Sequence, residues 1–172
     1  MPDTIKAPLA LTLICAAVCA LLALANGLTA DRIAAAESEQ LRQTLTQGFG
    51  DGEYTPLAGS YPGIDQIITD ANGQLIFEIT ASGYEKDGQH LLIGLDGSGA
   101  VSKIAVVSIK DSPTQAAAVQ TDAFLSQFIG QTAPDAGYDA VSGATRSSGG
   151  IADAVRRALQ TYQEHEELKA DA

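Results

Sequence analysis

The chain has 172 residues, which is enough for one domain with a hydrophobic core and a short additional segment. Its formal net charge of −11 argues against binding to nucleic acid, because the phosphates would repel such an acidic protein. Its two cysteines, Cys15 and Cys19, both lie in an N-terminal apolar run, so the rest of the sequence has neither a disulfide framework nor a thiolate metal site.

The N-terminal apolar run predicts a membrane anchor. Residues 7–25 carry no charge and, at about 1.5 Å per helical residue, nearly match the roughly 30 Å hydrocarbon core of a bilayer. Lys6 before the run and Asp31 after it favour a cytoplasmic N-terminus. We therefore expect residues 1–30 to cross the cell membrane once, in contact with lipid, with the soluble domain on the extracytoplasmic side. The alternative is a signal peptide cleaved after Ala25, which would place the domain in the same compartment.

Two connecting segments are expected between the anchor and the domain. Residues 31–47 have apolar side chains at helical spacing, which predicts a stalk helix that continues the anchor and is ended by Gly48. Residues 48–63 are rich in Gly and Pro, and this composition predicts an irregular linker.

Residues 64–168 predict a single α+β domain. Short apolar runs with β-branched or alternating residues are separated by Gly-containing turns, which predicts an antiparallel sheet with strands over residues 64–68, 74–82, 89–95 and 100–110. After Pro113 the spacing becomes helical, first as far as Gly130 and then over residues 149–168. Strands first and helices later favour an α+β fold with helices packed on the sheet.

The segment with the clearest chemical signal, residues 139–145, precedes the last predicted helix. A Gly-containing turn leads into a helix start, where unpaired N–H groups and the helix dipole favour a phosphate. Gly143 and Ala144 leave the backbone uncrowded beside the hydroxyl of Thr145, and Arg146 is placed to meet a phosphate.

Two further expectations concern the same segment. Ser147 or Ser148 is expected to be the N-cap of the last helix. Taken without any comparison, the segment is equally well interpreted as a loop of ordinary polar residues that enters a helix.

The sequence resembles flavinylated FMN-binding domains at the positions Asp139, Ser142, Gly143, Ala144 and Thr145. These residues fit the acceptor pattern Asp-x-x-(Ser/Thr)-Gly-Ala-(Thr/Ser) of that family. In such domains a separate flavin transferase takes FMN from FAD and joins its phosphate to the last Thr of the pattern. The resemblance therefore implies covalent FMN on Thr145, recognition or local hydrogen bonding by Asp139 and Ser142, and access for the transferase beside Gly143 and Ala144.

Weaker matches extend the resemblance over about residues 64–162. Ser82-Gly83-Tyr84 resembles the Ser-Gly-Tyr that opens the FMN-binding domain. Asp111 and Ser112 stand where the family often has the first residues of Glu-Thr-Pro-Gly-Leu-Gly, a turn near the flavin, so the resemblance implies that they contact FMN. The glycines expected after Pro113 are absent here.

With a single N-terminal span and one further domain, the chain is similar to the G subunits of Rnf electron-transport complexes, whose close relatives are the C subunits of Na⁺-pumping NADH:quinone oxidoreductases. This similarity implies a redox subunit of an ion-translocating oxidoreductase, whose partners are other integral-membrane subunits. One alternative is a stand-alone extracytoplasmic flavoprotein reductase or electron carrier. Another is an anchored binding or structural domain without flavin. His90 and His165 have no companions at ligand spacing, so we predict no metal site and no catalytic side chain.

Overall fold

The first helix, α1 (Asp3–Phe49), runs without interruption through the predicted anchor and stalk. The computed structural model describes residues 3–170, without the side chains of residues 3–7, 10, 30, 31, 34 and 170. The prediction that Gly48 ends the helix is wrong, because the chain stays helical to Phe49. Gly50, with a φ of +99°, then takes the left-handed conformation that ends many helices.

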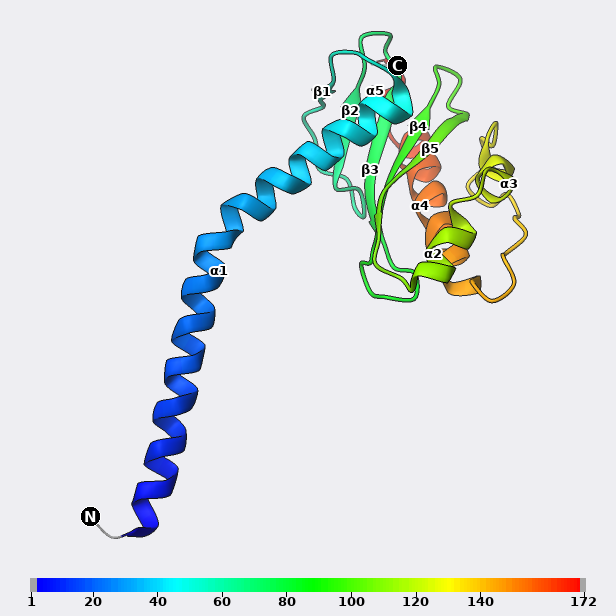
Figure 1. Cartoon of the computed structure of the whole chain (residues 1–172). Helices are drawn as coiled ribbons and strands as arrows, with labels where there is room; N and C mark the ends of the chain where they lie inside the picture. The colour runs from blue at the N-terminus through cyan, green and yellow to red at the C-terminus, as the bar shows by residue number, and fades with distance from the viewer. Residues whose placement is uncertain (1–2, 171–172) are drawn as a thin grey trace. The chain divides into compact units, whose positions relative to one another are not determined.

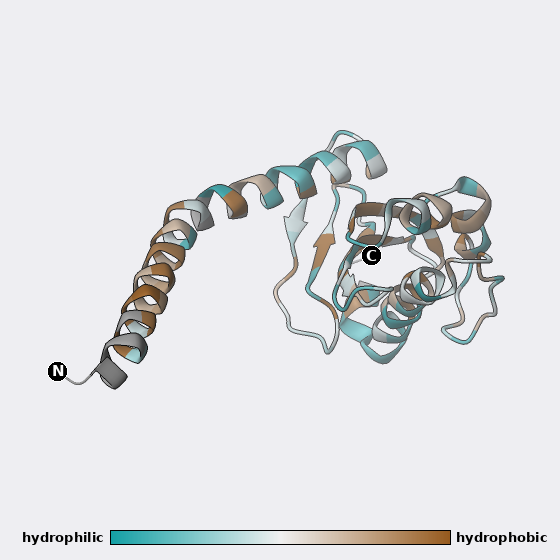
Figure 2. Ribbon diagram, turned by 60° about the horizontal axis from the view of Figure 1, so that its bottom comes forward, coloured by the Kyte–Doolittle hydropathy of each residue, from teal (hydrophilic) through white to brown (hydrophobic). Residues whose placement is uncertain are grey.

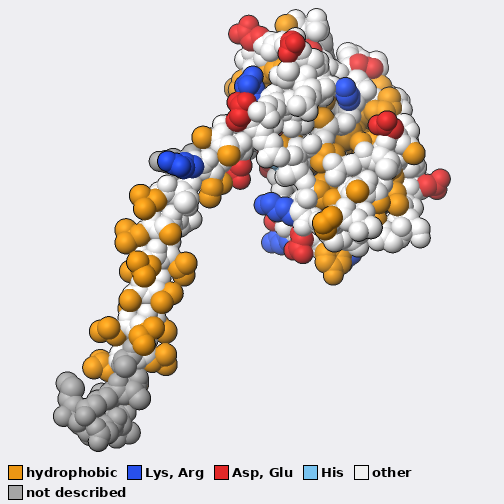
Figure 3. Space-filling model, in the orientation of Figure 1, with side chains coloured by type: hydrophobic (Ala, Val, Ile, Leu, Met, Phe, Trp, Pro, Cys, Tyr) orange, Lys and Arg blue, Asp and Glu red, His pale blue; other side chains and the backbone are white. Residues whose placement is uncertain are grey.

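One helix of the described part is long and apolar enough to cross a membrane, over Leu11–Thr29, and a signal sequence would have the same properties. Figure 2 shows that the N-terminal half of α1 is mostly hydrophobic and that hydrophilic residues become frequent further along it. In Figure 3 hydrophobic side chains cover this half of the helix. Met1, Pro2 and the side chains of Lys6 and Asp31, on which the predicted orientation depends, lie outside the described residues.

The chain divides into two compact units, residues 1–41 and 42–172. The second unit contains a five-stranded antiparallel sheet in which the spatial order of the strands is their order in the chain (Figure 1). The strands are β1 (Thr55–Pro56), β2 (Gln66–Thr69), β3 (Leu75–Ala81), β4 (Gln89–Leu95) and β5 (Val101–Ile109). The predicted antiparallel sheet and the α+β fold are therefore confirmed, although the short strand β1 lies in a segment predicted to be irregular.

The predicted helix after Pro113 is divided into three short pieces. They are α2 (Pro113–Val119), α3 (Asp122–Leu125) and the 3₁₀ turn η1 (Ser126–Phe128). The break occurs because Thr121 caps a new helix, where its side-chain oxygen accepts a hydrogen bond from the N–H of Phe124.

The last predicted helix is also corrected at both ends. It forms α4 (Thr145–Glu164), which begins at Thr145 rather than at residue 149. His165 then takes an extended backbone conformation, and α5 (Glu166–Ala170) follows as a separate short helix.

The hydrophobic core lies between one face of the sheet and α4, which packs across β3 and β4. The apolar stripe of α4 is fully buried there, and each such aliphatic side chain contributes about 1.5–3 kcal/mol to folding. The opposite face of the sheet is covered by the end of α1 within the same unit, where Leu45 is buried and the ring of Phe49 occupies the space above Gly94. Packing against the sheet thus fixes α4 along its length. This helix begins at the last residue of the acceptor pattern, residues 139–145, which is called the motif below.

Candidate functional site

Residues 139–145 form the turn that leads into α4. The N–H of Ala144 donates a 3.0 Å hydrogen bond to the carbonyl oxygen of Val141, which closes a four-residue turn. Gly143 is the third residue of this turn and has a φ of +79°, a value that a residue with a side chain adopts only at a cost. The glycine of the motif is therefore required by the turn itself.

Thr145 is the first residue of α4, and it is exposed to solvent. The N-cap is Ala144, whose side chain makes no capping hydrogen bond. Because the first N–H groups of a helix have no acceptor within it, the positive end of the α4 dipole lies open beside Thr145. The prediction that Ser147 or Ser148 is the N-cap is wrong, since both residues lie inside the helix and are buried.

Ser148 holds the turn against the helix. Its hydroxyl donates a 3.0 Å hydrogen bond to the carbonyl oxygen of Ala144 and accepts one of 3.0 Å from the N–H of Val141. Both ends of the turn are therefore fixed by one side chain one turn into α4.

Ser147 instead reaches across to the end of β5. Its hydroxyl donates a 2.5 Å hydrogen bond to Oδ2 of Asp111, a buried carboxylate. The same carboxylate accepts hydrogen bonds from the N–H groups of Tyr84 and Glu85 at 3.1 and 3.0 Å and from the side-chain amide of Gln89 at 3.1 Å. Asp111 thus joins the start of α4 to β4, β5 and the loop between β3 and β4.

The Asp111 carboxylate is held in its ionised form. Burial raises its pKa, but the hydrogen bonds from Ser147, the two backbone N–H groups and Gln89 together bring the pKa below its ordinary value of 3.8. Both oxygens of Asp111 accept hydrogen bonds from this chain, so its carboxylate holds the surrounding backbone and side chains in place. The predicted contact of Asp111 with FMN stays a prediction.

Gln89 was not singled out in the sequence. It is buried, and its side-chain amide donates to the carbonyl oxygen of Ser147 at 3.0 Å as well as to Asp111. Gly83 and Gly150 allow this close approach, because a Cβ atom on Gly83 would lie 2.6 Å from Asp111 Oδ2 and one on Gly150 would lie 2.8 Å from the carbonyl oxygen of Ser82. The signal in the sequence is Gly149-Gly150 inside a helix, which is costly unless another segment packs closely against the backbone.

Ser112 supports the motif through a neighbour. It is exposed, and its hydroxyl donates a 3.0 Å hydrogen bond to Oε1 of Gln115. The Nε2 group of Gln115 donates in turn to the carbonyl oxygen of Gly143 at 3.3 Å. α2 therefore contacts the turn through Gln115, and the hydrogen bond of Ser112 is to Gln115 rather than to the motif.

The side chains of Asp139 and Ser142 are exposed and have no hydrogen-bond partner among the described residues. The backbone of Asp139 is nevertheless fixed, because its N–H donates to Oε1 of Gln127 at 2.8 Å and its carbonyl oxygen accepts from Nε2 at 3.3 Å. The first residue of the motif is thus held at the backbone with its carboxylate free to meet another molecule.

Residues 83–160 match the family model of the FMN-binding domain. The match begins at Gly83, beside the Asp111 network, and includes the whole motif at the start of α4. An FMN-binding domain indicates a flavoprotein with a redox function. No curated protein matches the chain.

The residues at the start of α4 fit the phosphate of FMN. The guanidinium of Arg146 lies 5.9 Å from the centre of the Tyr84 ring, so a positive charge is held beside Thr145 by a cation–π contact. A Cβ atom on Gly143 would have no neighbour within 4 Å, so the space beside the turn is open. The exposed hydroxyl of Thr145 can carry a phosphate ester. The N–H groups at the start of α4 and the guanidinium of Arg146 can then bind the phosphate oxygens.

A metal ion has no comparable site in the described part of the chain. No group of three His, Cys, Asp or Glu side chains that could hold one lies in that part. His90 is paired with Glu78 at 2.7 Å, and His165 with Glu167 at 2.9 Å.

Proposed function

We propose that this protein is an electron-carrying subunit of a membrane redox complex that couples electron transfer to ion translocation, and that its FMN is joined to Thr145 by a phosphoester bond. The observation that carries the proposal is the exposed hydroxyl of Thr145 at a helix start without a side-chain cap, inside a segment that matches the FMN-binding domain. When bound, FMN supplies reversible electron transfer through its ring system.

The attachment is a phosphoryl transfer from FAD. The oxygen of the Thr145 hydroxyl forms a bond to the phosphorus of the FMN half, the pyrophosphate bond breaks, and AMP leaves. The hydroxyl proton goes to a base, and the nearby buried carboxylate of Asp111 is occupied by four hydrogen bonds. A separate flavin transferase therefore supplies the base, and the domain supplies an oriented acceptor.

The residues around Thr145 divide into two groups by their exposure. Asp139 and Ser142 are exposed and unpaired, which suits contacts with the transferase. Ser147 and Ser148 are buried and keep the start of α4 in place, so the backbone that carries the Thr145 hydroxyl is fixed. Arg146 would face the phosphate once the ester is formed.

The subunit assignment is supported by the apolar helix segment Leu11–Thr29 and by the small size of the single domain. Among the described residues, no group of His, Cys, Asp or Glu side chains could hold a metal ion as a second redox centre. Electrons must then enter and leave through partners, which we propose to be other integral-membrane subunits that move Na⁺ or H⁺. A stand-alone extracytoplasmic reductase is the second candidate.

The covalent bond is tested by expression of the full chain together with a flavin transferase. After denaturation, the protein band should fluoresce under ultraviolet light and its mass should rise by one FMN adduct. Thr145→Ala should abolish both signals and Thr145→Ser should keep them, while Thr114→Ala, which changes an exposed threonine of α2, should behave as the unchanged chain. A fluorescent Thr145→Ala band would mean that the flavin is attached elsewhere.

The complex is tested by mild detergent extraction of the tagged protein from its native membrane. Co-purification of other integral-membrane proteins in fixed proportion would support the subunit assignment. Purification of the flavinylated chain alone, with reductase activity toward a soluble acceptor, would favour the stand-alone alternative.

A further inference from the structure

The segment that joins β5 to α4 carries negative charge without any cation. Residues 112–145 contain Asp122, Asp135 and Asp139 and neither Lys nor Arg. All three side chains are exposed, and none has a hydrogen-bond or ion-pair partner among the described residues. Over residues 42–172, 17 acidic residues stand against 8 Lys and Arg, a net charge of −9. The segment therefore adds unpaired carboxylates to a domain that is already acidic.

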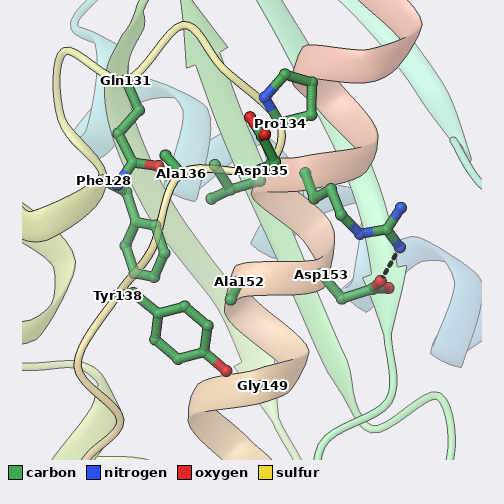
Figure 4. A pocket seen from close by; sticks show the side chains of 11 residues that line it. Phe128, Gln131, Pro134, Asp135, Ala136, Tyr138, Gly149, Ala152 and Asp153 are labelled. Carbon is green, nitrogen blue, oxygen red and sulfur yellow. Dashed lines mark hydrogen bonds and ion pairs between the residues drawn. The ribbon is translucent and has the colours of Figure 1, made fainter.

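A cavity of about 350 Å³ lies between this segment and α4. Figure 4 shows Phe128 and Tyr138 on the side of the segment and Ala152 on the side of α4. A cavity of about 150 Å³ is large enough to take up a benzene molecule, so this one has room for an apolar side chain of another protein. It is narrow at Gly149, where a Cβ atom would lie 3.7 Å from the Tyr138 hydroxyl, so we expect such a side chain to enter beside Phe128 and Ala152.

Large apolar side chains reach the surface in the same segment. Among the described residues of the second unit, those exposed are Tyr84, Ile129 and Tyr138. Ile129, 45% exposed, and Tyr138, 37% exposed, both belong to the segment, and Tyr138 also lines the cavity. Exposed apolar side chains beside a pocket with a polar edge are typical of a surface that binds another protein.

Carboxylates stand at the edge of the cavity. Asp135 lines it, and Asp139 follows four residues later. The nearby cations are already engaged, because Arg156 and Arg157 are both paired with Asp153. The charged groups without a partner are thus Asp135 and Asp139, so a docked molecule meets free negative charge around an apolar cavity.

This charge decides which kind of partner fits. A second copy of the domain would bring the same net charge of −9, and an anionic membrane surface would be repelled in the same way. A protein segment with Lys or Arg beside an apolar side chain fits instead, because its cations can meet Asp135 and Asp139 while the apolar side chain enters the cavity. Gly149, at the edge of the cavity, is about 6 Å along α4 from Thr145, so this partner would lie within about one helical turn of the proposed flavin attachment.

From these observations we propose that the surface formed by Ile129, Asp135, Tyr138 and Asp139, called the acidic face below, docks a basic segment of the protein that exchanges electrons with this chain. One apolar side chain of that segment occupies the cavity. The partner's part in electron exchange rests on the proposed function, whereas the docking itself does not.

The docking is tested with a synthetic probe of the stated chemistry. The isotope-labelled full chain in detergent micelles is titrated with the peptide acetyl-Lys-Lys-Leu-Lys-Lys-amide and followed by NMR. Shift changes should be confined to residues 128–139 and 149–156. A probe with Ser in place of Leu should bind about tenfold more weakly, because it has no side chain to bury in the cavity. A probe with Glu in place of each Lys should not bind.

Substitutions in the chain provide matched pairs. Asp135→Lys should weaken binding of the Leu probe about fivefold, whereas Asp65→Lys, the same charge change at an exposed position outside the acidic face, should alter it less than about twofold. Ala152→Leu fills the cavity and should weaken binding about tenfold, while Ala117→Leu adds the same atoms to an exposed position of α2 and should not. If Ala152→Leu lowers the melting temperature, the Leu and Ser probes make the same comparison on the unchanged chain.

Three results would overturn the docking. Shift changes spread over the acidic residues of the whole domain would mean that the probe follows net charge alone. Equal affinity for the Leu and Ser probes would mean that no side chain enters the cavity. Binding of the Glu probe as tight as that of the Lys probe would mean that the carboxylates of the acidic face do not select a basic partner.

A crosslinking arm separates the docking from the proposed function. A benzophenone amino acid replaces the exposed Ala133 of the chain in its native membrane, with the same replacement at Ala117 as the control. A redox protein that is crosslinked through a basic segment only from position 133, and that the Leu probe displaces, supports the docking. If this protein is soluble, the docking stands and the membrane complex fails. If membrane subunits co-purify but neither the crosslink nor probe binding is observed, the docking fails and the complex stands.

Discussion

The hydroxyl of Ser147 donates a 2.5 Å hydrogen bond to the carboxylate of Asp111, across 36 residues of sequence. This bond joins the first turn of α4 to Asp111, which follows the end of β5 at Ile109. The position of Thr145, the proposed acceptor two residues before Ser147, therefore depends on a carboxylate that is buried. Several expected effects of substitution and pH follow from this relationship and from the packing around it.

Substitution of Asp111 by Asn should destabilise the domain. An amide in that position cannot accept all four hydrogen bonds, and each buried donor that loses its acceptor costs about 1–3 kcal/mol. Urea unfolding followed by circular dichroism measures the difference. Asp65→Asn, at an exposed carboxylate, is the matched control and should change the unfolding free energy by less than about 0.5 kcal/mol. Equal effects of the two variants would show that the network contributes nothing.

The stability of the domain should fall in acid. The folded-state pKa of Asp111 is lowered, so its contribution to stability is present above the unfolded-state value near 3.8 and is lost as pH falls through the folded-state pKa. Unfolding free energy measured from pH 7 downward should therefore start to decrease near pH 4, and Asp111→Asn should flatten the curve. Asp96 provides the comparison: the Ser98 hydroxyl lowers its pKa, but it is exposed, so Asp96→Asn should alter the curve less.

The adjacent glycines of α4 should respond in opposite ways to alanine. Gly150→Ala places a methyl group against Gln89 and 2.8 Å from the carbonyl oxygen of Ser82, and this overpacking exceeds the gain in helix propensity, with a net loss on the order of 1 kcal/mol. Gly149→Ala meets only the Tyr138 hydroxyl at 3.7 Å and should stabilise the domain by up to about 1 kcal/mol. Melting temperatures that shift in the same direction would contradict the packing described for Gly150.

Gly143→Ala should slow flavinylation more than it destabilises the fold. The left-handed conformation at φ of +79° costs a residue with a side chain roughly 1–2 kcal/mol, which the turn relieves by a change in its path to Thr145. The rate at which a flavin transferase adds FMN, followed by in-gel fluorescence, should fall. Gly137→Ala is the control in the same loop, because a Cβ atom there has no neighbour within 4 Å and its φ is not positive. An equal rate for the two variants would argue that the shape of the turn is irrelevant.

The N-terminal helix should be retained as an anchor. The mature protein is expected to stay with membranes through carbonate washing and to keep residues 1–25 by intact mass, with the domain open to protease added from the extracytoplasmic side. A mature N-terminus at Asn26 in a soluble fraction would instead support the cleaved signal peptide.

The sheet was predictable because its signals are local. The strand Gln89–Leu95 was predicted with the bounds that the structure has, and β3 and β5 each differ by one residue at either end. Apolar alternation and Gly-containing turns are properties of a few neighbouring residues, so they can be recognised without knowledge of the fold.

The start of α4 was not predictable in the same way. Thr-Arg-Ser-Ser has no apolar periodicity, and serine before a helix ordinarily indicates a cap. The helix extends through these residues because Ser147 is bonded to Asp111 and Ser148 holds the turn at Val141. Such contacts join distant parts of the chain, so local spacing cannot predict them. The same holds for the hydrogen bonds of Gln89 to Asp111 and to the carbonyl oxygen of Ser147.

The strictly sequential order of the five strands has a consequence for the timing of maturation. Each strand pairs with its immediate predecessor in the chain, so the sheet can form hairpin by hairpin as the polypeptide emerges, without long loops to close. α4 follows the sheet in the chain, packs on β3 and β4, and is bonded to Asp111 through Ser147, so we expect the helix start at Thr145 to form after the sheet. If Thr145 is the acceptor that we propose, we expect a nascent chain to offer no formed acceptor site and flavin attachment to follow completion of folding.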